Sequence, residues 1–212
     1  MRDASTRGLV ASVADAYAHG ETVGTGSRHV VLLDCGVKKN IIRDLTALDA
    51  RVTVLPYGAT SAQVLAYDAD AVVVSPGPGD PRDLGDTVVM LRELIGKTPI
   101  FGVCLGHQLL ALACGAQTYK LKYGHRGGNQ PVKDVVHDEV LVTAHNHGYA
   151  VAGDTLPAHL EATMINLNDG TNEGFRHRTL TVEAVQFHPE ASPGPFDARG
   201  LFARWLERVE HE

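Results

Sequence analysis

Cysteine is scarce in this chain of 212 residues, which contains Cys35, Cys104 and Cys114. An odd number without paired spacing argues against a disulfide framework and suits a reducing cytosol, so we expect a cytoplasmic protein. No apolar run approaches the ~20 residues that a membrane span needs, and the first residues, MRDASTRGLV, lack the apolar core of a signal peptide. The net charge of -6 argues against nucleic acid or an anionic membrane as a partner.

Residues 1–28 differ in pattern from the rest of the chain. They hold one short helical pattern (Leu9, Val13, Ala16 and Tyr17), followed by HGETVGTGSR, a loose run typical of a linker. We therefore expect an N-terminal segment over 1–28 and one main domain over 29–212.

Within residues 29–212, short apolar runs first alternate with segments of helical period. HVVLLD, RVTVLPY, AVVVS and PIFGV read as strands, and the segments between and after them as helices, an order that predicts a parallel sheet. After Ala116 the pattern changes to strands with turns, and a hairpin signal at Asn168–Gly170 lies between two of them. The predicted strands are QTYKLK, PVKDVV, EVLVTAH, EATMINL and TVEAVQF. A helix from Leu201 to Val209 closes the chain. The expected fold class is α/β, doubly wound, with a mostly parallel central sheet, antiparallel edge strands and flanking helices.

The stretch PIFGVCLGHQLLALACG places Cys104 between two glycines, after a predicted strand and before a predicted helix. This G-x-C-x-G corner resembles a nucleophile elbow, a tight turn that exposes a reactive side chain above the sheet. Gly102 and Gly106 would be needed because side chains there would collide with the turn. The nearby helix N-terminus favours a thiolate. The alternative is a small core residue, as we interpret Cys35 and Cys114.

A cysteine nucleophile needs a base, and the base needs a group that orients it. VQFHPE, residues 185–190, offers both, because His188 ends an apolar strand and Pro189 forces an extended exit that can bring Glu190 back to the imidazole. A surface turn is the alternative for this segment taken alone.

SPGPGDP, residues 75–81, follows the strand AVVVS and forms a rigid loop whose amides can point into a site at the end of the sheet. The loop lacks the ending of a P-loop and the spacing of a dinucleotide site. A structural turn is possible, but beside Cys104 we favour an oxyanion hole made by the amides of Gly79 and Leu105.

Eleven histidines raise the alternative of a metal site. His145 and His147 would share one face of a strand, which can suit zinc, and His125 lies in YGHRGGNQP. No HExxH motif, cysteine pair or acidic cluster completes such a site in the sequence. We therefore expect no metal.

Together these motifs resemble a class I, triad-type glutamine amidotransferase domain, from about residue 29 to the C-terminus. GVCLGHQ, GPGDP and HPE carry the superfamily resemblance. DCGVKKNIIRDL, KYGHRGGNQPV, NHGYAV and HPEASPGPFDA resemble more narrowly the small subunit of carbamoyl phosphate synthetase.

The resemblance implies a role for each matching residue. Cys104 would attack the side-chain amide of L-glutamine, His188 would transfer protons and Glu190 would fix the imidazole. Gly79 and Leu105 would stabilise the oxyanion. The substrate's amino-acid end would be held by Gly77, Gln108, Asn146, Gly148 and Tyr149. This chain would need no cofactor. The ammonia would pass to a large subunit that uses ATP and Mg to make carbamoyl phosphate for arginine or pyrimidine biosynthesis.

Tyr149 stands where the family usually has phenylalanine, and Pro76 where asparagine is common. The family's first domain, which docks on the large subunit and contributes a serine to the pocket, is expected to be represented only by a tail in residues 1–28. The chain would then be a fragment or a split subunit, and alone a weak glutaminase. Two alternatives remain at this point: a glutamine-binding or assembly module with little turnover, and an α/β cysteine hydrolase that acts on γ-glutamyl peptides.

Overall fold

The computed structural model describes residues 8–14, 19–191 and 194–209. Ten strands form one mixed sheet in the order β1-β3-β2-β4-β5-β10-β9-β7-β6-β8. Its first half is the predicted parallel sheet, edged by the two-residue antiparallel strand β1 (Thr22–Val23). The parallel strands are β3 (Ala50–Pro56), β2 (Arg28–Asp34), β4 (Ala71–Val74), β5 (Ile100–Val103) and β10 (Val182–Val185).

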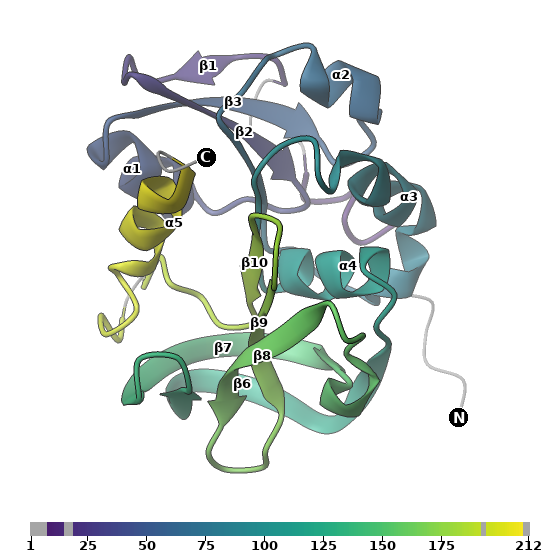
Figure 1. The fold of residues 1–212 in the computed structure, drawn as a ribbon, viewed down its shortest axis with the longest axis vertical. Helices are drawn as coiled ribbons and strands as arrows, with labels where there is room; N and C mark the ends of the chain where they lie inside the picture. Colours follow the sequence, from purple (N-terminus) through teal and green to yellow (C-terminus); the bar gives the residue numbers. More distant parts are fainter. Residues whose placement is uncertain (1–7, 15–18, 192–193, 210–212) are drawn as a thin grey trace.

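Helices cover both faces of this parallel part (Figure 1). One face packs against the apolar sides of α1 and α5, and the other against α2, α3 and α4, so the doubly wound prediction holds for this half. The helices are α1 (Lys39–Ala47), α2 (Ser61–Leu65), α3 (Gly85–Leu94), α4 (Leu105–Ala113) and α5 (Leu201–Val209), with short 3₁₀ turns at Pro81–Asp83 and Gly153–Thr155.

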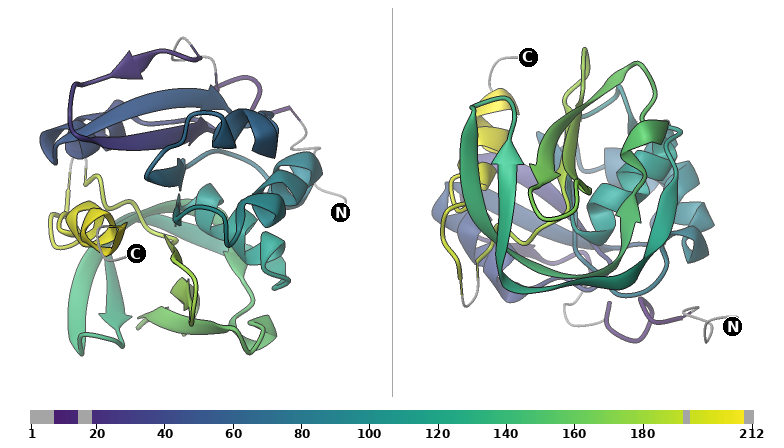
Figure 2. Two further views of the ribbon diagram at one scale, coloured as in Figure 1. Left: turned by 45° about the horizontal axis from the view of Figure 1, so that its top comes forward. Right: turned by 90° about the horizontal axis from the view of Figure 1, so that it is seen from below.

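The antiparallel half is larger than the edge strands we predicted. Its four strands curl toward a closed ring, because β8 pairs with both β6 and β9 (Figure 2). They are β6 (Thr118–Asp134), β7 (Glu139–Val151), β8 (Leu160–Asn166) and β9 (Asn172–His177). The sheet is therefore parallel in only one half, and the hairpin at Asn168–Gly170 joins β8 to β9.

The helical pattern predicted near the N-terminus needs a correction. Residues 8–14 form turns, in which Val10 and Ala14 are buried while Leu9 and Val13 are exposed. The buried face is thus one residue away from the predicted one. The remaining predicted positions, Ala16 and Tyr17, lie outside the described residues.

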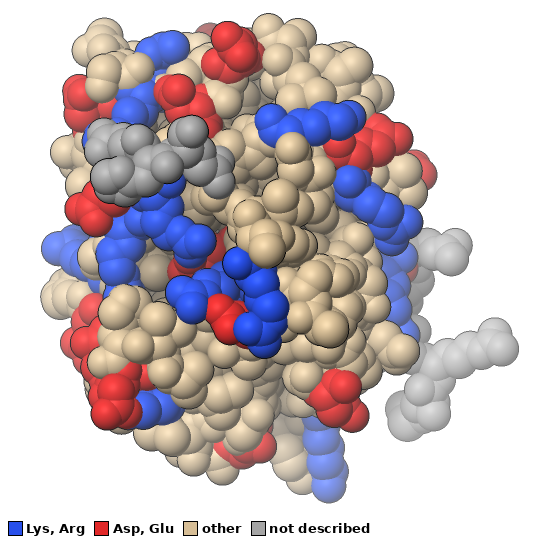
Figure 3. All heavy atoms as spheres, viewed as in Figure 1, with Lys and Arg blue, Asp and Glu red and all other residues tan. Residues whose placement is uncertain are grey.

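No helix in the described part of the chain is long and apolar enough to span a membrane. On the face shown in Figure 3, acidic and basic side chains are interspersed, with a group of basic side chains near the middle.

Candidate active site

The predicted elbow is present between β5 and α4. Cys104 has φ 54° and ψ -102°, a left-handed conformation that residues with a side chain rarely adopt. A Cβ on Gly102 would lie 2.7 Å from the backbone of Gly106, and one on Gly106 would lie 2.2 Å from the carbonyl oxygen of Val74. Close packing therefore requires both glycines. Strained residues of this kind often mark functional sites.

His188 and Glu190 lie beside Cys104, as the HPE motif predicts. The His188 backbone amide donates to the Ala144 carbonyl, which anchors the segment to β7. Its ring hydrogen-bonds to the Cys104 side chain on one side and, through Nδ1 at 2.8 Å, to Oε1 of Glu190 on the other. The three groups thus lie in one continuous hydrogen-bonded chain, in the order that a nucleophile, its base and an orienting carboxylate require.

The electrostatics favour a protonated His188 and an ionised Glu190. Burial alone would lower the pKa of His188, but Cys104 and Glu190 outweigh it and raise that pKa to about 9. Burial would likewise raise the pKa of Glu190, but the hydrogen bonds and charges of His188 and Lys38 lower it to about 2. A protonated imidazole between a sulfur and a carboxylate is therefore stable at neutral pH.

The other two cysteines are in unreactive surroundings. Burial raises the pKa of Cys114 to about 11, and burial together with Asp34 raises the pKa of Cys35 further still. Both are free thiols. Because the thiolate is the nucleophile, neither is suited to the chemistry expected of Cys104.

Lys38 is a site residue that the sequence did not reveal. Its Nζ lies 2.9 Å from Oε1 of Glu190 and 3.2 Å from Nδ1 of His188, and its side chain is 44% exposed. The motif DCGVKKN carries it, but only as part of the family resemblance. Lys38 and Arg126 both line the cavity beside Cys104 and bring positive charge to it.

We expect Lys38→Met to lower kcat/KM of the Cys104-dependent reaction by about 2- to 5-fold, since a half-exposed ion pair contributes ~1 kcal/mol or less. The pKa of Glu190 should rise from about 2 without the lysine, so the acid limb of the pH–rate profile should move to higher pH. Lys39→Met, which removes the neighbouring exposed charge, should change neither quantity. Equal effects of the two substitutions would remove Lys38 from the site.

The cavity next to Cys104 has a volume of about 410 Å³. Most of the residues predicted to bind substrate surround it together with Cys104 and His188, although they come from distant parts of the chain. They are Gly77, Gly79, Gln108, Asn146, Gly148 and Tyr149. The structure therefore brings these residues together, while their individual roles stay predictions.

The GPGDP loop is held against the rest of the site by close packing. A Cβ on Gly77 would lie 2.2 Å from the carbonyl oxygen of Cys35, and Gly79 has φ 99°. Leu105 differs from the other predicted site residues, because its side chain is buried in the core rather than facing the cavity. Its amide is nevertheless at the first position of α4, where helix amides lack an intrahelical acceptor.

Gln108 lines the cavity, although its side chain is almost completely buried. Its Nε2 donates to the carbonyl oxygen of Tyr149 at 2.8 Å and to Oε1 of Gln186 at 3.0 Å. Both amide hydrogens are thus used to hold β7 and the segment after β10. Only Oε1 remains as a group with which Gln108 could contact a substrate.

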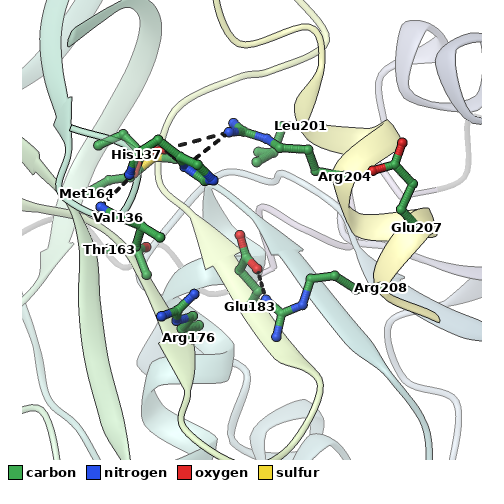
Figure 4. Close-up of a pocket in the computed structure, with 11 residues that line it drawn as sticks. Val136, His137, Thr163, Met164, Arg176, Glu183, Leu201, Arg204, Glu207 and Arg208 are labelled. Carbon is green, nitrogen blue, oxygen red and sulfur yellow. Dashed lines mark hydrogen bonds and ion pairs between the residues drawn. The ribbon is translucent and has the colours of Figure 1, made fainter. Parts of the chain in front are cut away.

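A second cavity, of about 330 Å³, lies between α5 and the strands β8 to β10 (Figure 4). Arg208 of α5 forms an ion pair there with Glu183 of β10. Within the described ranges, this cavity and the one beside Cys104 share no lining residue, and this one contains no cysteine. The candidate catalytic groups therefore belong to the cavity beside Cys104.

An elbow cysteine beside a histidine–glutamate pair and a glycine-rich loop, on a mixed α/β sheet, is the arrangement of an enzyme that uses a cysteine nucleophile. Residues 31–207 match the family model described as glutamine amidotransferase class-I, so the chain belongs to this family. The family resemblance of the sequence motifs is thereby confirmed.

Comparison with curated proteins shows which members of this family the chain is similar to. The chain is 52% identical over 187 residues to the carbamoyl phosphate synthase small chain of Bacillus caldolyticus, covering 88% of this chain and 51% of that protein. It is 49% identical over 187 residues to the pyrimidine-specific small chain of Bacillus subtilis, with 88% and 51% coverage. The chain thus spans about half the length of these relatives.

Solved structures support the fold. A Thermoplasma acidophilum protein described as a subunit of GMP synthase matches with a TM-score of 0.70 at 23% identity, covering 86% of this chain and 96% of that one. A glutamine amidotransferase from Thermotoga maritima matches with a TM-score of 0.62 at 19% identity, covering 88% and 86%. At these identities the similarity concerns the fold alone.

Proposed function

We propose that this chain hydrolyses L-glutamine to glutamate and ammonia as the amidotransferase part of a carbamoyl phosphate synthase small chain. The observation that carries the proposal is the hydrogen-bonded set of Cys104, His188 and Glu190 beside a cavity of about 410 Å³. The similarity to curated small chains supports the choice of this family member.

In the first half of the reaction, the Cys104 thiolate attacks the side-chain carbonyl carbon of glutamine. The new C–S bond pushes the carbonyl electrons onto oxygen, where the amides of Gly79 and Leu105 would stabilise the charge. His188 donates its proton to the leaving nitrogen. The C–N bond then breaks, which releases ammonia and leaves a γ-glutamyl thioester.

In the second half, neutral His188 takes a proton from water, which attacks the thioester carbon. The C–S bond breaks, glutamate leaves, and the thiolate–imidazolium pair is restored. Oε1 of Gln108 can accept from the substrate's ammonium group, because its own amide hydrogens are occupied. The ammonia would pass to a large subunit that combines it with bicarbonate at the expense of ATP.

A glutamine analogue carrying an electrophile at the δ-carbon should label Cys104 alone, and excess glutamine should slow the labelling. Cys35 and Cys114 should stay unmodified, because burial keeps both protonated. Peptide mass spectrometry after timed exposure measures this. Labelling of Cys35 or Cys114 at the same rate, or no protection by glutamine, would count against the proposal.

Competition between two substrates separates this function from the peptidase alternative, because hydrolysis of either one releases glutamate but only glutamine releases ammonia. With equal concentrations of glutamine and a γ-glutamyl dipeptide, we expect glutamine to be consumed faster. Preferential cleavage of the dipeptide would instead identify a γ-glutamyl hydrolase with the same triad.

A further inference from the structure

Four side chains from three strands converge behind the wall of the glutamine pocket. His125 of β6 lies opposite His147 of β7, His145 points to the same side of β7, and Glu173 comes from β9. One ligand atom from each of the four lies within 4.8 Å of all the others. We expected no metal because no acidic cluster accompanies these histidines in the sequence. In the folded chain, Glu173 of β9 brings a carboxylate to them.

Two of these converging atoms are buried and lack a hydrogen bond of regular geometry. Among the residues that the structure describes, these atoms are Oε2 of Glu173 and Nδ1 of His125. Glu173 is completely buried: its Oε1 accepts from the side-chain amide of Asn166 at 3.0 Å and lies 3.3 Å from Nδ1 of His125, while its Oε2 lies 3.6 Å from Nδ1 of His145. A fully buried carboxylate is costly unless a positive charge lies close to it.

Each histidine of this cluster is fixed by a hydrogen bond on its outer nitrogen. Nε2 of His125 lies 2.8 Å from the carboxylate of Asp169, and Nδ1 of His147 lies 2.8 Å from the carbonyl oxygen of Tyr149. Nε2 of His145 lies 2.7 Å from the hydroxyl of Thr143. Outer hydrogen bonds of this kind orient metal-binding histidines, and they leave the inner nitrogens free to face a common point.

The directions of the hydrogen bonds in the cluster place two nitrogen lone pairs face to face. A carbonyl only accepts, so His147 carries its hydrogen on Nδ1 and presents a lone pair at Nε2. The Thr143 hydroxyl donates to the Gln130 carbonyl at 2.9 Å, so it accepts from Nε2 of His145, whose Nδ1 then also presents a lone pair. These two lone pairs face each other at 3.0 Å, an arrangement that a cation between them would stabilise.

The spacing suits zinc. Tetrahedral Zn²⁺ with bonds of about 2.0–2.1 Å places its ligand atoms about 3.3 Å apart. Two of the separations lie close to this value, at 3.0 Å between His145 and His147 and 3.6 Å between His145 and Oε2 of Glu173, and all of them lie within 4.8 Å.

We propose that His125, His145, His147 and Glu173 bind one Zn²⁺ ion in a structural site that ties β6, β7 and β9 together. Three imidazoles and one carboxylate form a closed set of four protein ligands, the number that structural zinc sites have. His147 also lines the glutamine cavity, and Asn146 and Gly148 of the same strand are its neighbours there. The ion would therefore stiffen the strand that forms one wall of that cavity.

The test measures zinc retention by the whole chain, loaded with Zn²⁺ and dialysed against metal-free buffer. The expected result is one zinc per chain, with His145→Gln and Glu173→Gln each weakening binding by at least about 100-fold. Asp169→Asn, which leaves all four ligands in place, should weaken it about 10-fold through the orientation of His125. Retention that is unchanged in His145→Gln and Glu173→Gln would overturn the site.

Two controls address other zinc ligands. Cys104→Ser should retain its zinc, which excludes the catalytic thiol. His137→Gln should retain it too, because that histidine belongs to a second cluster, Asp134, His137 and Glu139, whose carboxylates already lie 3.8 Å from Arg204.

X-ray absorption at the zinc edge of the unmodified chain gives a readout that does not depend on the variants folding. It should show nitrogen and oxygen ligands at about 2.0–2.1 Å and no sulfur. A sulfur ligand, or no zinc retained by the unmodified chain, would overturn the proposal. If the unmodified chain retains no zinc, Thr143 donates to His145 and the cluster is a metal-free hydrogen-bond network.

Discussion

Replacing Cys104 by serine is expected to lower the rate of glutamine hydrolysis by at least about 10⁴-fold, to the background of the assay. The rate is lost because a serine hydroxyl is far less acidic than a thiol, and His188 alone does not ionise it at neutral pH. Loss of one member of a catalytic triad typically removes most of the rate enhancement that the set provides. Steady-state release of glutamate measures the effect.

The fold should survive this substitution. Serine has nearly the shape of cysteine, and the left-handed turn at position 104 is set by the packing of Gly102 and Gly106. Glutamine should therefore still bind, and isothermal titration of the variant would measure that binding. Cys35→Ser and Cys114→Ser are the matched controls, and both should keep their activity. Comparable rates in Cys104→Ser and the unmodified chain would disprove the proposed function.

The parallel half of the sheet could be predicted because its strands are buried on both faces. Buried strands of this kind read as continuous apolar runs, such as VVLL before Asp34. The antiparallel half gave a weaker signal. β9 reads NEGFRH, whose polar residues conceal a strand, although four of its six residues are buried. The glycine-rich run GHRGGNQ likewise hid the fact that β6 continues from Thr118 to Asp134.

The candidate site was predictable where its partners are close in sequence. His188 and Glu190 are two residues apart, and the elbow is a local turn, so short motifs contain both. Lys38 is 150 residues from His188, and only the topology of the sheet brings them together. The same is true of Glu173, which lies on the strand that the pattern missed. Single-sequence patterns report local geometry and carry little information about such distant pairs.

Replacing Glu190 by glutamine is expected to lower kcat by about 10²- to 10⁴-fold. Oε1 of Glu190 accepts from Nδ1 of His188 at 2.8 Å, which keeps the lone pair of the neutral ring on the nitrogen facing Cys104. A carboxamide can instead donate to Nδ1 and so stabilise the wrong tautomer. It also leaves the charge of Lys38 uncompensated beside the imidazolium that the mechanism requires.

The pH profile distinguishes this role from a merely structural one. Glu190 contributes to raising the pKa of His188 to about 9, so in Glu190→Gln that pKa should fall. The thiolate–imidazolium pair would then be lost at lower pH, and the alkaline limb of the profile should move toward neutrality. Glu183→Gln, which breaks the ion pair with Arg208 in the other cavity, is the control and should leave both kcat and the profile unchanged. An unshifted alkaline limb in Glu190→Gln, or an equal loss of rate in Glu183→Gln, would show that Glu190 does not orient the base.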